Sequence, residues 1–176
     1  AVCEEEEDKK HGYIGGNENS AILLEFIGGE PLLEVDLIDK ILSYFRWKAI
    51  SENHRWAVQH MIAISTNGVN YETEKVQKFI EKYKERLSIS ISIDGNKRNN
   101  MYRVFKNGKS SFNRLFMNIL KIKEKYPIYF QKNISFISVL HDKNSVIDIH
   151  NFIQKHFGKK PKISTINSIG IRKEKK

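Results

Sequence analysis

Hydrophobic and polar positions follow two alternating repeat lengths along the chain. Short segments rich in apolar residues predict strands over residues 21–27, 60–65, 87–93, 134–140 and 162–166. The first is an apolar run typical of a buried strand, and residues 87–93 alternate strictly between apolar residues and serine. Between these segments, apolar residues recur every three or four positions over residues 34–46, 72–86, 112–126 and 142–157, which predicts amphipathic helices. Pro127 is expected to end the third helix, and residues 51–58 and 96–109 are predicted to be polar loops.

This strict alternation predicts an α/β fold of parallel strands joined by right-handed helical crossovers. An open doubly wound sheet and a (β/α) barrel both fit the order of elements. In both architectures, ligands bind at the carboxyl ends of the strands. The residues directly after each predicted strand are therefore the first candidates for a functional site.

The end of the first strand carries the sequence Gly28-Gly29-Glu30-Pro31. Paired glycines allow the backbone to approach a ligand closely, and the Glu30 carboxylate suits an ammonium group. The ends of the later strands carry hydroxyl, amide, carboxylate, guanidinium and imidazole groups: Ser65, Asn67, Ser92, Asp94, Arg103, Ser138 and His141. Such a set suits a zwitterionic amino acid attached to a polar nucleoside, although the spacing alone does not establish that ligand.

Three of these strand ends resemble motifs of the radical S-adenosylmethionine (radical SAM) enzymes. They are Glu25-Phe-Ile-Gly-Gly-Glu-Pro-Leu-Leu33, Ser65-Thr-Asn-Gly68 and Ser90-Ile-Ser-Ile-Asp-Gly95, in the order and at the intervals that the family shows. The chain is most similar to the SPASM-type peptide maturases, which carry a C-terminal auxiliary-cluster domain. The resemblance runs from about Cys3 to the C-terminus.

The resemblance implies a partial (β/α)6 radical SAM barrel of alternating parallel strands and helices, with a [4Fe-4S] cluster and S-adenosyl-L-methionine as cofactors. In the family, residues 28–31 would meet the methionine amino group, Ser92 would contact the cofactor, and Arg103 would bind its carboxylate as a bidentate pair. The other polar strand-end residues are expected to contribute to the same cofactor site: Ser65, Asn67, Asp94 and Ser138. Arg103 lies one residue nearer to Asp94 than in the family pattern, and the family's His-Asp pair is absent from the intervening loop.

Cys3 is the only cysteine of the chain. The family holds its cluster with three cysteines spaced C-x3-C-x2-C, and the resemblance implies that Cys3 corresponds to the third. The chain would then be a fragment that lacks the first strand, two cluster ligands and the auxiliary-cluster domain. Residues 1–171 would form the incomplete core barrel and residues 172–176 a basic tail. A free thiol in a terminal segment is the alternative interpretation of Cys3.

The intact parent is expected to be an enzyme that cleaves S-adenosylmethionine at the cluster. The resulting 5′-deoxyadenosyl radical would abstract hydrogen from a peptide or protein substrate, with a reductant such as flavodoxin or ferredoxin as a further partner. The fragment alone is expected to be inactive. Two alternatives stay open, namely a catalytically dead radical SAM-like module that binds peptides and a basic nucleic-acid-binding protein.

Composition and charge restrict the classes of protein to which the chain could belong. The net charge is +9, with a net of −8 over residues 1–40 and +17 over residues 41–176. Lysines are scattered along predicted helices without interleaved aromatics, a pattern that argues against nucleic-acid binding. A single cysteine excludes a disulfide scaffold and a self-contained zinc site. No apolar run approaches the roughly 20 residues that span a bilayer, and the predicted location is cytoplasmic, without membrane contact.

Overall fold

The structure is a computed structural model that describes residues 21–165. Its strands are β1 (Ile22–Phe26), β2 (His60–Thr66), β3 (Leu87–Ser92), β4 (Ile134–Leu140) and β5 (Lys162–Thr165). Its helices are η1 (Pro31–Leu33), α2 (Val35–Ser51), η2 (Arg55–Ala57), α3 (Glu74–Tyr83), α4 (Phe112–Lys125), α5 (Pro127–Asn133) and α6 (Val146–Phe157). The strands have the order β1-β2-β3-β4-β5, and the β1–β2 and β4–β5 pairs are parallel. This is the predicted α/β architecture of a partial (β/α) barrel.

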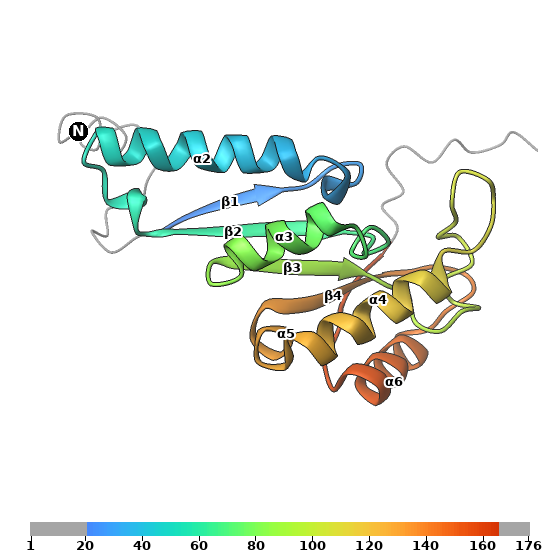
Figure 1. The fold of residues 1–176 in the computed structure, drawn as a ribbon. Coiled ribbons are helices and arrows are strands. Elements are labelled where there is room, and N and C mark those ends of the chain that lie inside the picture. Colours follow the sequence, from blue (N-terminus) through green and yellow to red (C-terminus); the bar gives the residue numbers. More distant parts are fainter. Residues whose placement is uncertain (1–20, 166–176) are drawn as a thin grey trace, which may run out of the picture. The chain divides into compact units, whose positions relative to one another are not determined.

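The chain divides into two compact units. The first comprises residues 21–66 and 70–89, with α2 and α3 lying over the paired strands β1 and β2 (Figure 1). Ile62 and Ile64 on one face of β2 are buried, as are the residues that α2 and α3 turn inward. The opposite face of the pair is open, because Leu23 and Met61 lie side by side in register and are 56% and 40% exposed.

The second unit comprises residues 67–69 and 90–165, with α4, α5 and α6 beside β4 (Figure 1). Its core is aromatic. Phe136 of β4 stacks on Phe157 of α6 with ring centroids 4.8 Å apart, and Phe130 of α5 completes a fully buried trio. Stacked and tilted ring pairs of this kind add to the stabilisation that burial itself provides.

The structure confirms the predicted alternation but changes several boundaries. Helix α2 continues to Ser51 rather than ending near residue 46, because buried Ala49 extends the apolar repeat of Leu42 by two turns. Pro127 separates two helices and opens the second, since the first helical position needs no amide hydrogen. Helix α6 begins at Val146, after Ser145, whose hydroxyl caps it by accepting from the amide of Asp148 at 3.1 Å.

Candidate functional site

Glu30 lies at the carboxyl end of β1, and Thr66 and Leu32 are among the residues that hold it there. Its Oε1 accepts a hydrogen bond from the Thr66 hydroxyl at 2.5 Å and from the amide of Leu32 at 3.1 Å. Thr66 ends the neighbouring parallel strand, so the bond ties two strand ends together. The carboxylate is half-buried, and it is therefore a positioned acceptor that a ligand can still reach.

The glycines before Glu30 keep this strand end open. Gly28 has a φ of +101°, a conformation that side chains other than glycine rarely adopt. No atom lies within 4 Å of an ideal Cβ placed on either Gly28 or Gly29, and both residues are exposed. Backbone strain rather than crowding therefore favours glycine at position 28, and a ligand has room beside it.

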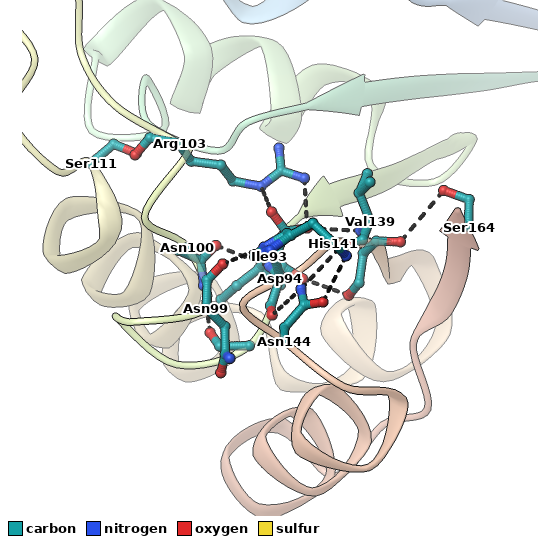
Figure 2. A network of polar contacts seen from close by, with 12 residues as sticks. Ile93, Asp94, Asn99, Asn100, Arg103, Ser111, Val139, His141, Asn144 and Ser164 are labelled. Atoms are coloured by element: carbon teal, nitrogen blue, oxygen red, sulfur yellow. Dashed lines mark hydrogen bonds and ion pairs between the residues drawn. The ribbon is translucent and has the colours of Figure 1, made fainter. Parts of the chain in front are cut away.

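In the second unit, Asp94 and Arg103 form the centre of a polar network (Figure 2). The Arg103 Nε donates to Asp94 Oδ2 at 2.6 Å, and Nη2 donates to Oδ1 at 2.8 Å. Oδ1 also accepts from the amide of Val139 on β4 at 2.8 Å. The Asp94 side chain is 5% exposed and that of Arg103 is 24% exposed, so this is a largely buried bidentate pair.

Asparagines hold the loop that joins Asp94 to Arg103. The amide of Asp94 donates to Asn100 Oδ1 at 2.9 Å, and Asn100 Nδ2 donates to the carbonyls of Gly95 at 2.6 Å and Asn96 at 2.9 Å. Asn100 is fully buried. An ideal Cβ on Gly95, whose φ is +112°, would lie 2.8 Å from Asn99 Oδ1, so this turn admits no larger residue without rearrangement.

His141 joins the same network from the end of β4 (Figure 2). Its Nδ1 accepts from the amide of Lys143 at 3.1 Å, which leaves Nε2 to donate to the carbonyl of Asn99 at 2.8 Å. The two bonds fix the neutral Nε2–H tautomer. Beside it, hydrogen bonds from Lys143 and then from Tyr102 lower the pKa of Asp142.

A short hairpin follows Arg103. Val104 and Ser110 form an isolated antiparallel bridge, and the hydroxyl and amide of Ser111 both donate to the carbonyl of Arg103, at 2.9 and 3.2 Å. The tip between the bridge residues is largely exposed. The hairpin is therefore anchored at its base, and most of its tip faces solvent.

The remaining predicted residues have different environments. Ser65 of β2 and Ser92 of β3 are half-buried on strand faces, and Asn67 is exposed and accepts from the amide of Val69 at 2.9 Å. Ser138 is fully buried and donates to the carbonyl of Ile93 at 2.5 Å. Cys3 lies outside the described residues. A direct cofactor contact by any of these residues stays a prediction.

The predicted site residues thus fall into two groups. Residues 28–31 and Ser65 belong to the first unit, and Asn67, Ser92, Asp94, Arg103 and Ser138 belong to the second. The first group suits an ammonium group, because the Glu30 carboxylate is a positioned hydrogen-bond acceptor that lies next to the exposed backbone of Gly28 and Gly29. The second suits a carboxylate through Nη1 of Arg103, since Nε and Nη2 already bind Asp94. Asp94 and Ser138 make their contacts within the protein.

Sequence reasoning did not identify the residues that support these groups: Thr66, Asn100, Asn118 and Asn144. Asn118 offered a signal, because it falls among the core-facing residues Leu115, Ile119 and Ile122 of α4. It is fully buried, and its Nδ2 donates to the carbonyls of Gly68 at 2.9 Å and Val69 at 3.0 Å. This side chain therefore fixes the turn after β2.

Within residues 21–165, no three His, Cys, Asp or Glu side chains are placed to hold a metal ion together. None of the helices in that range has the length and apolar character needed to cross a bilayer.

No protein-family model matches the sequence. The uncharacterized protein MJ0907 of Methanocaldococcus jannaschii is 38% identical over 96 residues, which are 54% of this chain and 30% of that protein. The fold is similar to that of anSMEcpe, an anaerobic sulfatase-maturating radical SAM enzyme, solved with bound AdoMet. That likeness has a TM-score of 0.67 at 17% identity and covers 91% of this chain and 41% of the enzyme.

A second structure of anSMEcpe, with bound AdoMet and the Kp18Cys peptide, is similar with a TM-score of 0.63 at 17% identity, over 82% of this chain and 38% of that one. The chain therefore spans less than half the length of each of these proteins. The likeness shows that the chain has the fold of a partial radical SAM barrel.

Proposed function

We propose that the chain is part of the core domain of a radical SAM enzyme and binds S-adenosylmethionine at the carboxyl ends of its strands. The observation that carries the proposal is Glu30, a carboxylate held by Thr66 and by the amide of Leu32 beside exposed glycine backbone. The three strand-end motifs and the fold support the same function. The activity of the whole protein is part of this proposal, because the chain spans only a part of its relatives.

The chain's own residues bind and orient the cofactor in this proposal. Glu30 accepts hydrogen bonds from the methionine ammonium group, and the glycines at positions 28 and 29 let the ligand lie close to the backbone. Ser92 contributes a hydroxyl at the end of β3. Arg103, which Asp94 holds by two hydrogen bonds, receives the carboxylate at Nη1.

A [4Fe-4S] cluster, to which Cys3 would contribute one thiolate, would supply reductive cleavage of the bound cofactor and so a radical for hydrogen abstraction. The substrate class that we propose is a peptide or protein, and the electron donor is a reductant of the flavodoxin or ferredoxin class. The peptide bound in an anSMEcpe structure supports this choice of substrate.

Equilibrium dialysis with S-adenosylmethionine tests the role of Glu30. Glu30→Gln removes the charge but keeps the side chain's size, and it is expected to weaken binding about tenfold, since a hydrogen bond to a charged group contributes about 1.5–3 kcal/mol. Glu34→Gln is the matched control, because Glu34 is exposed nearby and makes no side-chain cap of α2.

Equal affinities of the Glu30→Gln and Glu34→Gln proteins would contradict the proposed site, and so would an absence of binding in the unmodified protein. The nucleic-acid alternative makes the opposite prediction. Binding to DNA or RNA would weaken steeply with added salt and would not respond to Glu30→Gln.

A further inference from the structure

The first unit contains a cavity of about 580 Å³ that no part of the proposed function uses. It lies at the amino end of β2, where His60 lines it together with residues from the second half of α2, from η2 and from the end of α3. Thr66, which holds Glu30, is at the other end of the same strand, about 20 Å away at the rise of an extended chain. Within the first unit, the cavity is therefore separate from the strand end that carries Glu30.

Two guanidinium groups give this cavity a positive charge. Arg46, Arg86 and His60 line the same cavity. Burial lowers the pKa of His60, and the charges of Arg86 and Arg46 lower it further. The Arg86 Nη1 donates to the carbonyls of Val58 and His60. In the described part of the chain, neither Arg46 nor Arg86 forms an ion pair with a carboxylate.

The other charged groups of the lining offset this charge only in part. Lys82 is bound by Asp39 at 2.6 Å, so that cation is already neutralised. Glu85 also lines the cavity, but within residues 21–165 it pairs with neither arginine. Two arginines against the one carboxylate of Glu85 leave the lining net positive, which favours binding of an anion.

The remaining wall is apolar and accessible. Trp47, Ile50 and Val58 line the cavity with 61%, 57% and 65% of their surfaces exposed, and buried Leu42 lines it as well. Exposed apolar side chains that gather at a cavity are typical of binding sites. The volume is in the range of small-molecule sites.

We propose that this cavity binds a small amphipathic anion, a phosphate or carboxylate that carries one flat apolar ring. The oxyanion lies between Arg46 and Arg86, since the planar guanidinium donates to phosphate and carboxylate oxygens in pairs. The ring lies against Trp47 and Ile50. At the base of the cavity, the Nδ1 of His60 donates to the carbonyl of Trp56 at 2.8 Å, which holds the imidazole in place.

Phenyl phosphate is the probe for this proposal, and isothermal titration calorimetry gives its affinity. We expect it to bind at least tenfold more tightly than inorganic phosphate, which lacks the ring, or benzyl alcohol, which lacks the charge. Arg46→Gln is expected to weaken phenyl phosphate at least tenfold. Lys40→Gln is the control, because it removes one exposed positive charge from the same helix outside the cavity.

Nuclear magnetic resonance locates the bound probe. The indole N–H signal of Trp47 is expected to shift with phenyl phosphate, and the shift is expected to vanish in the Arg46→Gln protein. Equal affinity for the three probes, or equal losses in Arg46→Gln and Lys40→Gln, would overturn the proposal. Glu30→Gln is expected to leave phenyl phosphate binding unchanged, so the outcome is independent of the cofactor site.

Discussion

A methyl group added at Gly68 would test the packing of the turn after β2. Gly68 is buried with a φ of +70°, and an ideal Cβ there would lie 2.7 Å from Leu115 Cδ1 and 3.1 Å from Ile91 Cγ2. Leu115 and Ile91 are each 1% exposed, so neither side chain can move into solvent. Gly68→Ala therefore forces a rearrangement of the core.

The loss of stability expected for Gly68→Ala follows from a comparison with the same change at Gly158, the residue after α6. Its φ is +69°, but nothing lies within 4 Å of an ideal Cβ there. Both alanine variants bear a backbone cost of about 1–2 kcal/mol, partly offset by about 0.4–1 kcal/mol from the stiffer unfolded chain. Only Gly68→Ala adds overpacking, at about 1–3 kcal/mol. We expect it to be the less stable variant by about 2 kcal/mol.

Urea unfolding followed by far-ultraviolet circular dichroism measures the free energy of unfolding of both variants. Both glycines belong to the same compact unit, so the same transition reports on each. Equal losses would refute the close approach of Gly68 to Leu115. As a second check, Leu115→Ala is expected to cost less in the Gly68→Ala protein than in the unmodified one, because residues in contact are not additive.

Two further changes test other parts of the molecule. Asp94→Asn removes the charge that faces Arg103 and is expected to lower the free energy of unfolding by about 3 kcal/mol. The control Asp142→Asn changes a side chain that is 59% exposed and is expected to cost less than about 1 kcal/mol. Equal costs of the two changes in urea unfolding would contradict the buried Asp94–Arg103 pair. Burial and two nearby arginines lower the pKa of His60 below its usual 6.5, so the folded protein resists a proton that the unfolded chain accepts. This contribution to stability is present above pH 6.5 and is lost as the pH falls towards the lowered pKa. The free energy of unfolding, measured on both sides of pH 6.5, should therefore fall more for the unmodified protein than for His60→Gln. Parallel pH profiles of the two proteins would contradict the lowered pKa of His60.

The repeat lengths of apolar residues were sufficient to predict the alternation of strands and helices. The boundaries that differ have local causes. Pro127 stops one helix and starts another, and a stop signal alone does not distinguish these roles. Helix α2 runs on past Trp47 because Ala49 is buried, and a small residue is a weak signal of burial in sequence.

The sequence was sufficient to predict that the candidate site residues lie at strand ends, but not which residues they contact. Glu30 and Thr66 are 36 residues apart, and only the pairing of β1 with β2 brings them into contact. Arg103 was expected to bind a ligand carboxylate, and in the structure it binds the carboxylate of Asp94, nine residues away. Which acceptor a charged side chain meets depends on the path of the loop, and that path depends on buried Asn100.

The anchored hairpin after Arg103 has a practical consequence for labelling. Its base is closed by the Val104–Ser110 bridge and by the two bonds from Ser111, while Gly108 turns the tip with a φ of +78° and open space around it. Added residues at this tip would extend outward without changing the entry and exit points of the chain. The tip is thus a permissive position for an epitope or a fluorophore, one that leaves the Asp94 network below it undisturbed.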